Sequence, residues 1–459
     1  MPPAAALSRS RLPSFPLEFY GADLRVPLVS GEQVRYVNLD CAASPPCLRA
    51  AHDAVQRALP WYGSVNRGAG YASEVSTRLL ASSRAAIHAF AGARRDDAVV
   101  LTRNTTEALN LLASCLPAET AVVVFDAEHH ANLLPWRGAR CVQLPVPRRR
   151  EQIVERAREA LAALPARHRL LAVTGASNVT GELWPIEELC ATARREGARV
   201  VVDAAQLAPH RAIDLAALGA DWIALSAHKL YAPFGCGALI GRTDWLDAAP
   251  PWLAGGGAVR RVSRDAVEWT HGPARHEAGT PNLLGAAAFA AAGRTLETAG
   301  WDAIETHESA LLDQLLDGLR GLREVEVLSL WGPSAPRIGV VSFTVRGWEP
   351  ALLSAALSAE YGIGVRDGAF CAHPLLAELV RDGGAHGRLP SALRASFGAA
   401  SQPEDVSRLV AALREILTRG LRWKYVRREG RYVPERDPRA QPELGLPFAG
   451  SVARPCDQA

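Results

Sequence analysis

Hydrophobic positions between about residues 97 and 242 form short continuous runs separated by helical patterns. Strands that are buried on both faces have uninterrupted apolar runs of this kind, and Ala/Leu/Arg segments such as 185–197 are typical of crossover helices. The pattern predicts an α/β domain with a mostly parallel central sheet. The runs are VVLT at 99, AVVVF at 121, LLAVT at 170, VVVD at 200, WIALS at 222 and GALIG at 237.

Beyond about residue 300 the pattern changes to longer helical repeats, which indicates a second, smaller α+β domain. Helices are predicted over 304–322, near 350–360 and over 403–418, with an alternating strand over 339–345. The expected parts are an N-terminal arm at 1–34 that packs with the small domain, a large domain at 35–300, the small domain at 301–419, and a basic, proline-rich extension at 420–459.

The composition is that of a folded protein, since 48% of the 459 residues are hydrophobic and 22% are charged. The 51 basic and 48 acidic side chains nearly balance, so charge alone indicates neither nucleic acid nor an anionic membrane as a partner. The longest apolar stretch, Leu283 to Gly293, is too short to span a bilayer. The first residues lack the apolar core of a secretory signal, and we expect a cytoplasmic protein.

The cysteines and lysines of the chain restrict the kinds of site that it can contain. The eight cysteines include no CxxC pair, which argues against a zinc site and a disulfide framework, and no metal site is expected. Only Lys229 and Lys424 are lysines among 51 basic residues. Arginine stays protonated and cannot attack an aldehyde as an amine can. Lys424 lies in a charged tail, whereas Lys229 follows a buried strand and is the candidate nucleophile.

Ligands of a doubly wound sheet bind at the carboxyl ends of its strands. Thr105 and Thr106 follow one such strand where a helix begins, with Asn104 as its N-cap, so hydroxyl and amide groups could receive a phosphate there. An ordinary capped helix is the alternative. Asp203 ends a fully apolar strand and needs a cationic or strongly donating partner. A pyridinium N–H would serve, although a helix cap or salt bridge would also account for it.

Lys229 lies in SAHKLYAPFGCG, directly after another buried strand. Partial desolvation lowers the pKa of a lysine and makes the neutral amine available. Ser226 and His228 can donate hydrogen bonds toward an anion beside it. A lysine that forms a Schiff base, an acid for a ring nitrogen and a hydroxyl-lined anion pocket are together what pyridoxal phosphate requires.

Ten segments, in order from Tyr36 to about Leu417, resemble those of the class V aminotransferase and cysteine desulfurase family of pyridoxal-phosphate enzymes. Each is modest alone, but ten in register are highly specific. The resemblance implies the type I pyridoxal-phosphate transferase fold, with a large α/β domain and a smaller α+β domain. The segments are YVNLDCAAS, NRGAGYAS, RNTTEALN, EHHANLLPW, SNVTGELWPI, VVDAAQLAPH, SAHKLYAPFGCGALIGR, ARHEAGTPN, VRDGAFCAHP and LRASFG.

The resemblance also implies which residues hold the cofactor and the substrate. Thr280 would reach the phosphate of the neighbouring subunit, so a homodimer with sites at its interface is implied. Arg394 would receive the carboxylate of an amino-acid substrate as a bidentate guanidinium, with Arg366 and Asn178 beside it. Lys229 would be the Schiff-base lysine, and His129 would stack on the ring as a catalytic residue. Asp203 would bind the pyridine nitrogen, with Gln206 and Asn178 near the ring hydroxyl. Thr106, Ser226 and His228 would hold the phosphate beside Thr105.

Cys371 in VRDGAFCAHP matches the catalytic cysteine of desulfurases that resemble the SUF-system type. In such enzymes the cysteine thiolate attacks the sulfur of L-cysteine, becomes a persulfide and releases L-alanine. Arg366, five residues earlier, could hold the thiolate or the substrate, since positive charge lowers the pKa of a thiol. A sulfur-acceptor protein is a possible partner.

The departures from the family pattern fall mainly on the substrate side. Cys41, Ala227, the pair Ala369 and Phe370, and the triplet 400–402 replace residues that are usually more polar or smaller. A different reaction of the same family, such as transamination, epimerisation or β-elimination, therefore stays open, with Cys371 as a spectator. A non-catalytic sensor or a regulator that binds nucleic acid is less favoured, because no helix-turn-helix segment precedes the domain.

Overall fold

The computed structural model describes residues 17–65, 68, 70–380 and 390–446. Parts of the predicted arm and extension lie outside the described residues, as do three residues of the NRGAGYAS segment. The residues left out are 1–16, 381–389 and 447–459, together with Asn66, Arg67 and Ala69.

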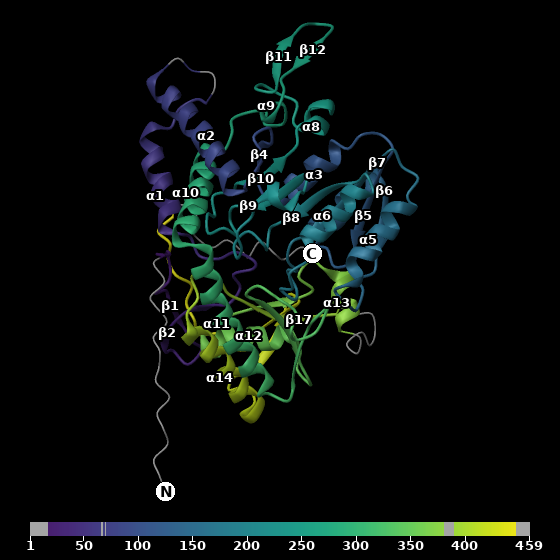
Figure 1. The fold of residues 1–459 in the computed structure, drawn as a ribbon. Helices are drawn as coiled ribbons and strands as arrows, with labels where there is room; N and C mark the ends of the chain where they lie inside the picture. Colours follow the sequence, from purple (N-terminus) through teal and green to yellow (C-terminus); the bar gives the residue numbers. More distant parts are fainter. Residues whose placement is uncertain (1–16, 66–67, 69, 381–389, 447–459) are drawn as a thin grey trace.

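A seven-stranded sheet in the order β4-β10-β9-β8-β7-β5-β6 forms the centre of the large domain (Figure 1). Neighbouring strands from β9 to β6 run parallel, and β10 runs antiparallel to both β4 and β9. The predicted α/β class with a mostly parallel sheet is therefore confirmed. The strands are β4 (Ala98–Thr102), β5 (Thr120–Phe125), β6 (Arg140–Leu144), β7 (His168–Thr174), β8 (Arg199–Asp203), β9 (Trp222–Ser226) and β10 (Gly237–Gly241).

Six of these strands coincide with the six apolar runs of the sequence. Strand β5 shows why the runs are continuous, because Val123 and Phe125 pack into one core of the sheet and Val122 and Val124 into the other. Strand β6 was not predicted. It lies at the edge of the sheet, where most of its side chains are exposed or half-buried, so it carries no apolar run.

Helices cover both faces of the large sheet. On one face, the apolar side chains of one group of helices share the core with the sheet, and a second group of helices packs on the other face. The first group is α1 (Arg49–Ala58), α2 (Tyr71–Phe90), α5 (Gln152–Ala163), α6 (Ile186–Arg195) and α10 (Leu283–Ala299); the second is α3 (Thr105–Ser114), α4 (His130–Leu133) and α8 (Asp244–Ala248). The hairpin of β11 (Val259–Val262) and β12 (Val267–Trp269) projects from this domain (Figure 1).

The small domain has its own core around a four-stranded antiparallel sheet in the order β13-β14-β17-β16. The helices and the strand predicted for this region are all present, within a few residues of the expected bounds. Figure 1 shows α11, α12 and α14 gathered around this sheet. The elements are β13 (Val325–Val327), β14 (Val340–Val345), β16 (Arg366–Gly368), β17 (Ala392–Ser396), α11 (Trp301–Arg320), α12 (Pro350–Tyr361), α13 (His373–Leu379) and α14 (Pro403–Arg419).

Hairpins near both ends of the described chain contact the small domain, whereas Phe19, closer to the N-terminal end, pairs with Leu48 of the large domain. In the hairpin of β1 (Arg25–Pro27) and β2 (Gln33–Arg35), the Val29 amide donates to the Ala359 carbonyl at 2.9 Å. Strand β3 (Val37–Asn38) pairs in parallel with β15 (Ile363–Gly364). The hairpin of β18 (Tyr425–Arg428) and β19 (Arg431–Pro434) is fixed by Tyr425, whose hydroxyl donates to Glu360 at 2.9 Å.

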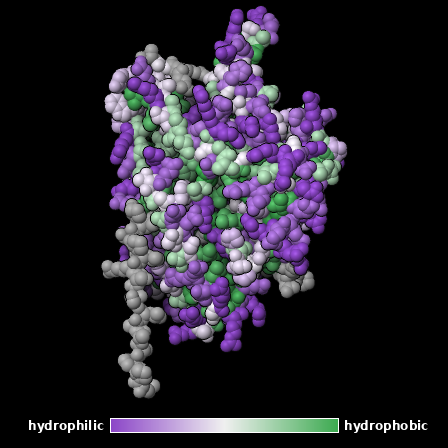
Figure 2. Space-filling view, in the orientation of Figure 1, coloured by the Kyte–Doolittle hydropathy of each residue, from purple (hydrophilic) through white to green (hydrophobic). Residues whose placement is uncertain are grey.

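The face shown in Figure 2 is dominated by hydrophilic residues, with hydrophobic residues gathered near its middle. Within the described residues, no helix combines the length and the apolar character that crossing a bilayer requires.

Candidate active site

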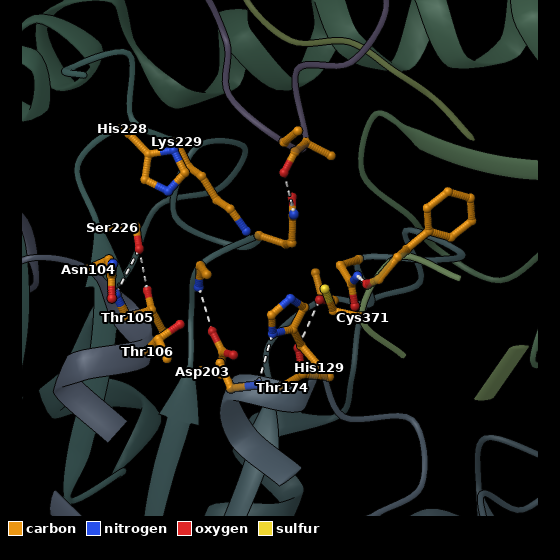
Figure 3. A pocket seen from close by; sticks show the side chains of 18 of the residues that line it. Asn104, Thr105, Thr106, His129, Thr174, Asp203, Ser226, His228, Lys229 and Cys371 are labelled. Atoms are coloured by element: carbon orange, nitrogen blue, oxygen red, sulfur yellow. Dashed lines mark hydrogen bonds between the residues drawn. The ribbon is translucent and has the colours of Figure 1, made fainter. Parts of the chain in front are cut away.

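A cavity of about 290 Å³ lies at the carboxyl ends of the central strands, where residues of the small domain also line it (Figure 3). Every predicted site residue except Thr280 lines it. Thr280 is exposed just before α10 and outside this cavity, so its predicted contact with a neighbouring subunit stays a prediction. The lining residues predicted from the sequence are Thr105, Thr106, His129, Asn178, Asp203, Gln206, Ser226, His228, Lys229, Arg366, Cys371 and Arg394.

The first turn of α3 forms one end of the cavity. Asn104 caps the helix by accepting a hydrogen bond from the Glu107 amide at 3.0 Å. The Thr105 hydroxyl lies 2.7 Å from the Ser226 hydroxyl at the end of β9, and Thr106 lies beside them (Figure 3). Hydroxyl groups at the positive end of a ten-residue helix suit an anion. This end of the cavity can therefore hold a phosphate.

Asp203 lies at the end of β8 with only 5% of its surface exposed. Its Oδ1 accepts the Ala205 amide at 2.9 Å, and no described cation forms an ion pair with it. Burial raises the pKa of Asp203, while the Ala205 N–H and nearby Lys229 act in the opposite direction. A buried carboxylate with so few donors can receive a positively charged N–H from a ligand.

Lys229 follows β9 and points into the cavity (Figure 3). Burial lowers the pKa of its ammonium from 10.5 to about 8, although the Asp203 carboxylate opposes this shift. The neutral amine is therefore accessible near physiological pH, as a nucleophile toward an aldehyde needs. Burial also lowers the pKa of His228, whose ring nitrogen Nδ1 lies 3.3 Å from the Ser44 hydroxyl, to about 4.

His129 is a neutral imidazole at pH 7, because burial and the neighbouring Lys229 lower its pKa to about 3. Its Nδ1 accepts the Ala131 amide at 3.0 Å, which leaves the ring proton on Nε2. Asn178 donates to the Phe370 carbonyl at 2.7 Å, and Gln206 donates to the Ala42 carbonyl at 2.9 Å. Each amide nitrogen carries a second N–H, which remains available for a ligand.

Two arginines lie at the other end of the cavity. Arg394 on β17 donates to the Asn178 carbonyl and to the Asp40 carboxylate, each at 3.0 Å. Arg366 on β16 forms an ion pair with the same carboxylate at 3.7 Å. The Arg394 guanidinium also lies 5.0 Å from the centre of the Phe370 ring. This end can bind a carboxylate.

Cys371 presents an exposed thiol on a tight turn at the cavity. Phe370 and Cys371 have φ angles of +53° and +54°, and the Ala372 amide closes the turn on the Ala369 carbonyl at 2.9 Å. Left-handed backbone costs about 1–2 kcal/mol for a residue with a side chain. Surrounding contacts hold the turn, since the Cys371 carbonyl accepts the His130 amide at 2.8 Å. Strain maintained in this way is typical of functional loops.

Three residues with clear contacts to the site were given no role from the sequence. Asp40 lies in the YVNLDCAAS segment, but nothing local indicates its arginine partners. Phe370 departs from the polar residue usual at this position in the family, and this departure does not reveal its contact with Arg394. Glu128 is fully buried behind His129, where it accepts the Thr174 amide at 2.9 Å and the Asn132 side chain at 2.7 Å. Burial raises the pKa of Glu128 to about 8. The available signal was an acid three residues after the buried strand β5.

A doubly wound sheet with a lysine, an aspartate and an anion pocket at its strand ends defines a class of cofactor-dependent enzymes. The family model described as aminotransferase class-V matches residues 37–409, and the chain belongs to this family. The class V resemblance seen in the sequence is therefore confirmed.

Similar proteins carry the name cysteine desulfurase. A probable cysteine desulfurase of Vibrio cholerae is 34% identical over 84% of this chain and 94% of its own length. A cysteine desulfurase of Dickeya dadantii is 36% identical over 88% of this chain and 97% of its own.

Solved structures agree with this likeness. The cysteine desulfurase CsdA of Escherichia coli, in an S-sulfonic acid form, is 33% identical, with a TM-score of 0.73 over 83% of this chain and 94% of that chain. An apo cysteine desulfurase of Thermococcus onnurineus is 32% identical, with a TM-score of 0.75 over 84% of this chain and 95% of that chain. These neighbours confirm the fold type and support an enzyme.

Proposed function

We propose that the cavity holds pyridoxal phosphate on Lys229. The donor set fits this group: a primary amine of lowered pKa, a buried carboxylate without an ion-pair partner among the described residues, and a hydroxyl-lined helix start for the phosphate. When bound, pyridoxal phosphate supplies the electron sink that weakens the bonds at the α-carbon of an amino acid.

The chain's own groups would divide the remaining tasks. Asp203 would bind the ring N–H, and the neutral His129 ring would pack on the ring face. The second N–H groups of Asn178 and Gln206 would donate to the ring oxygen. Once the Lys229 amine is free, it can move a proton at the substrate α-carbon, because its pKa of about 8 lies near the working pH.

The rate at which cofactor-free protein takes up pyridoxal phosphate should depend on the Lys229 pKa. Only the neutral amine attacks the aldehyde, so we expect the rate to rise with pH and level off above about 8, rather than near 10.5. Stopped-flow absorbance from roughly pH 6 to pH 10 measures this profile, with free lysine acetylated on its α-amine, which leaves the side-chain amine reactive, as the control. A midpoint near that of the free lysine would show that burial does not tune this amine.

We further propose that the enzyme is a cysteine desulfurase acting on L-cysteine. The observation that carries this proposal is the exposed Cys371 thiol in the same cavity as Lys229 and the two arginines. The relatives named cysteine desulfurase support it. Arg394 would hold the substrate carboxylate, which directs the substrate side chain toward the turn that carries Cys371.

The sulfur-transfer step balances without an external oxidant. The Cys371 thiolate attacks the substrate sulfur, so an S–S bond forms while the bond between that sulfur and the β-carbon breaks. The β-carbon gains a hydrogen, and the products are L-alanine and a Cys371 persulfide. A thiol reductant or an acceptor protein then removes the sulfur.

Replacing Cys371 by alanine tests this proposal. The wild-type protein with L-cysteine and a reductant should make sulfide and alanine in equal amounts, and Cys371→Ala should make neither, because the sulfur has lost its nucleophile. Cys141→Ala is the matched control, since Cys141 is also an exposed thiol but does not line the cavity. Sulfide and alanine are measured together over time.

Two outcomes would contradict the desulfurase proposal. If Cys371→Ala is as active as the wild type, Cys371 is a spectator. If pyruvate and ammonia replace alanine as products, the enzyme is a lyase of the same family.

We also propose that the protein acts as a cytoplasmic homodimer with a sulfur-acceptor protein as partner. The support for the dimer is the exposed Thr280, which lies outside the cavity of its own chain but matches a family position that contacts the neighbouring cofactor phosphate.

A further inference from the structure

Two arginines face each other at one end of the cavity. Arg366 on β16 is the register partner of Arg394 on β17, and both side chains line the cavity. Like charges directly opposite each other on antiparallel strands repel. Water screens this repulsion poorly at Arg394, whose side chain is only 5% exposed. The Arg366 side chain is 57% exposed, so it is the buried Arg394 that needs an anion before any ligand arrives.

Asp40 supplies that anion from a distant part of the sequence, just after β3. A parallel bridge to Ser396, at the end of β17, fixes its backbone. Its Oδ1 lies 3.0 Å from Nη2 of Arg394, and its Oδ2 lies 3.7 Å from Nη1 of Arg366. One carboxylate thus faces both arginines. It offsets one of their two positive charges and leaves one.

Arg394 keeps hydrogen-bond donors for a ligand while it is bound to Asp40. Its Nη1 donates to the Asn178 carbonyl and its Nη2 donates to Asp40. A guanidinium carries five N–H groups. Nη1 and Nη2 each use one N–H in these two contacts and keep a second one, whereas the Nε–H is buried away from solvent. A single ligand carboxylate can therefore bind Arg394 without displacing Asp40.

We propose that Asp40 is a specificity-determining residue that restricts the site to amino acids with one carboxylate. This inference rests on the proposed function, in which Arg394 receives the α-carboxylate of an amino acid. Asp40, Arg366 and Arg394 together carry one net positive charge, and the α-carboxylate neutralises it. A second carboxylate on the side chain then meets Asp40 and an arginine that is already neutralised, so it is repelled. An uncharged thiol side chain meets no such repulsion.

The test compares the binding of L-alanine and L-aspartate to the cofactor-loaded protein by isothermal titration calorimetry. The measured quantity is the ratio of the Kd for aspartate to the Kd for alanine. Asp40→Asn leaves Arg366 free to pair with a side-chain carboxylate, so we expect the ratio to fall at least about tenfold. Arg366→Gln removes the remaining positive charge, so the ratio should rise.

The double variant Asp40→Asn with Arg366→Gln carries the same total charge as the wild-type set, and its ratio should return toward the wild-type value. Asp367→Asn is the matched control, because Asp367 is the neighbour of Arg366 on β16 and does not line the cavity. Its ratio should not move. Arg366→Gln and the double variant do not leave two arginines without a carboxylate, so they are expected to fold even if Asp40→Asn alone does not. They still test whether the net charge of Asp40, Arg366 and Arg394 sets the ratio.

If Asp40 has a purely structural role, Asp40→Asn should weaken the binding of alanine and aspartate by the same factor, and the ratio of their Kd values should stay unchanged. An unmoved ratio in this variant, or in Arg366→Gln, overturns the inference while the proposed function stands. If the wild-type protein binds neither amino acid, the proposed substrate class and the inference both fall.

Discussion

Replacing Lys229 by alanine is expected to abolish the yellow absorbance at roughly 410–430 nm that a lysine-bound pyridoxal phosphate gives the loaded protein. Lys229 is the one lysine among the residues lining the cavity, and burial holds its pKa near 8, so no other described side chain there can form the Schiff base. Absorbance spectra, followed by borohydride reduction and mass measurement of the protein, report the loss directly.

Lys424→Ala is the matched control, because Lys424 is the second and last lysine of the chain. It lies on the C-terminal hairpin, where its ammonium is 3.1 Å from Glu435 and its side chain is 76% exposed. This variant should keep the full absorbance and the borohydride-trapped cofactor. Cofactor that is still trapped by borohydride in Lys229→Ala would disprove the assignment of the Schiff-base lysine.

The main strands could be predicted from the sequence because their burial is local information. A strand with helices on both faces needs apolar side chains at successive positions, and each run such as VVLT or AVVVF shows this directly. The edge strand β6 and the hairpin of β18 and β19 lack this requirement, because one side of each faces solvent. Their sequences are mixed, and only contacts with the rest of the molecule show them as strands.

The part of the candidate site that lies at the strand ends could also be predicted from the sequence. Lys229, Asp203 and Thr105 follow apolar runs, and a parallel sheet brings the ends of its strands together, so their meeting in one cavity follows from topology. The contact between Asp40 and Arg394 joins positions 354 residues apart, and no local pattern indicates it. The positive φ of Phe370 and Cys371 could not be predicted from the sequence either, because neither residue is a glycine.

Replacing Asp203 by asparagine is expected to lower turnover by about 10²- to 10³-fold, the usual cost of removing one preorganised electrostatic contact. Asparagine keeps the size and can still accept the Ala205 amide, but it has no charge to balance a protonated ring nitrogen. The cofactor should stay attached, since Lys229 is unchanged. Steady-state turnover and absorbance spectra of the same preparation separate the two effects.

A second readout distinguishes this role from a structural one. The Asp203 carboxylate raises the pKa of Lys229 against the effect of burial, so its removal should shift the midpoint of cofactor loading to a pH below 8. Asp126→Asn, directly after strand β5 of the same sheet but outside the cavity lining, should change neither turnover nor this midpoint. If Asp203→Asn matches the wild type in both measurements, the carboxylate serves only to cap the Ala205 amide, which is the ordinary structural role that its sequence position also allows.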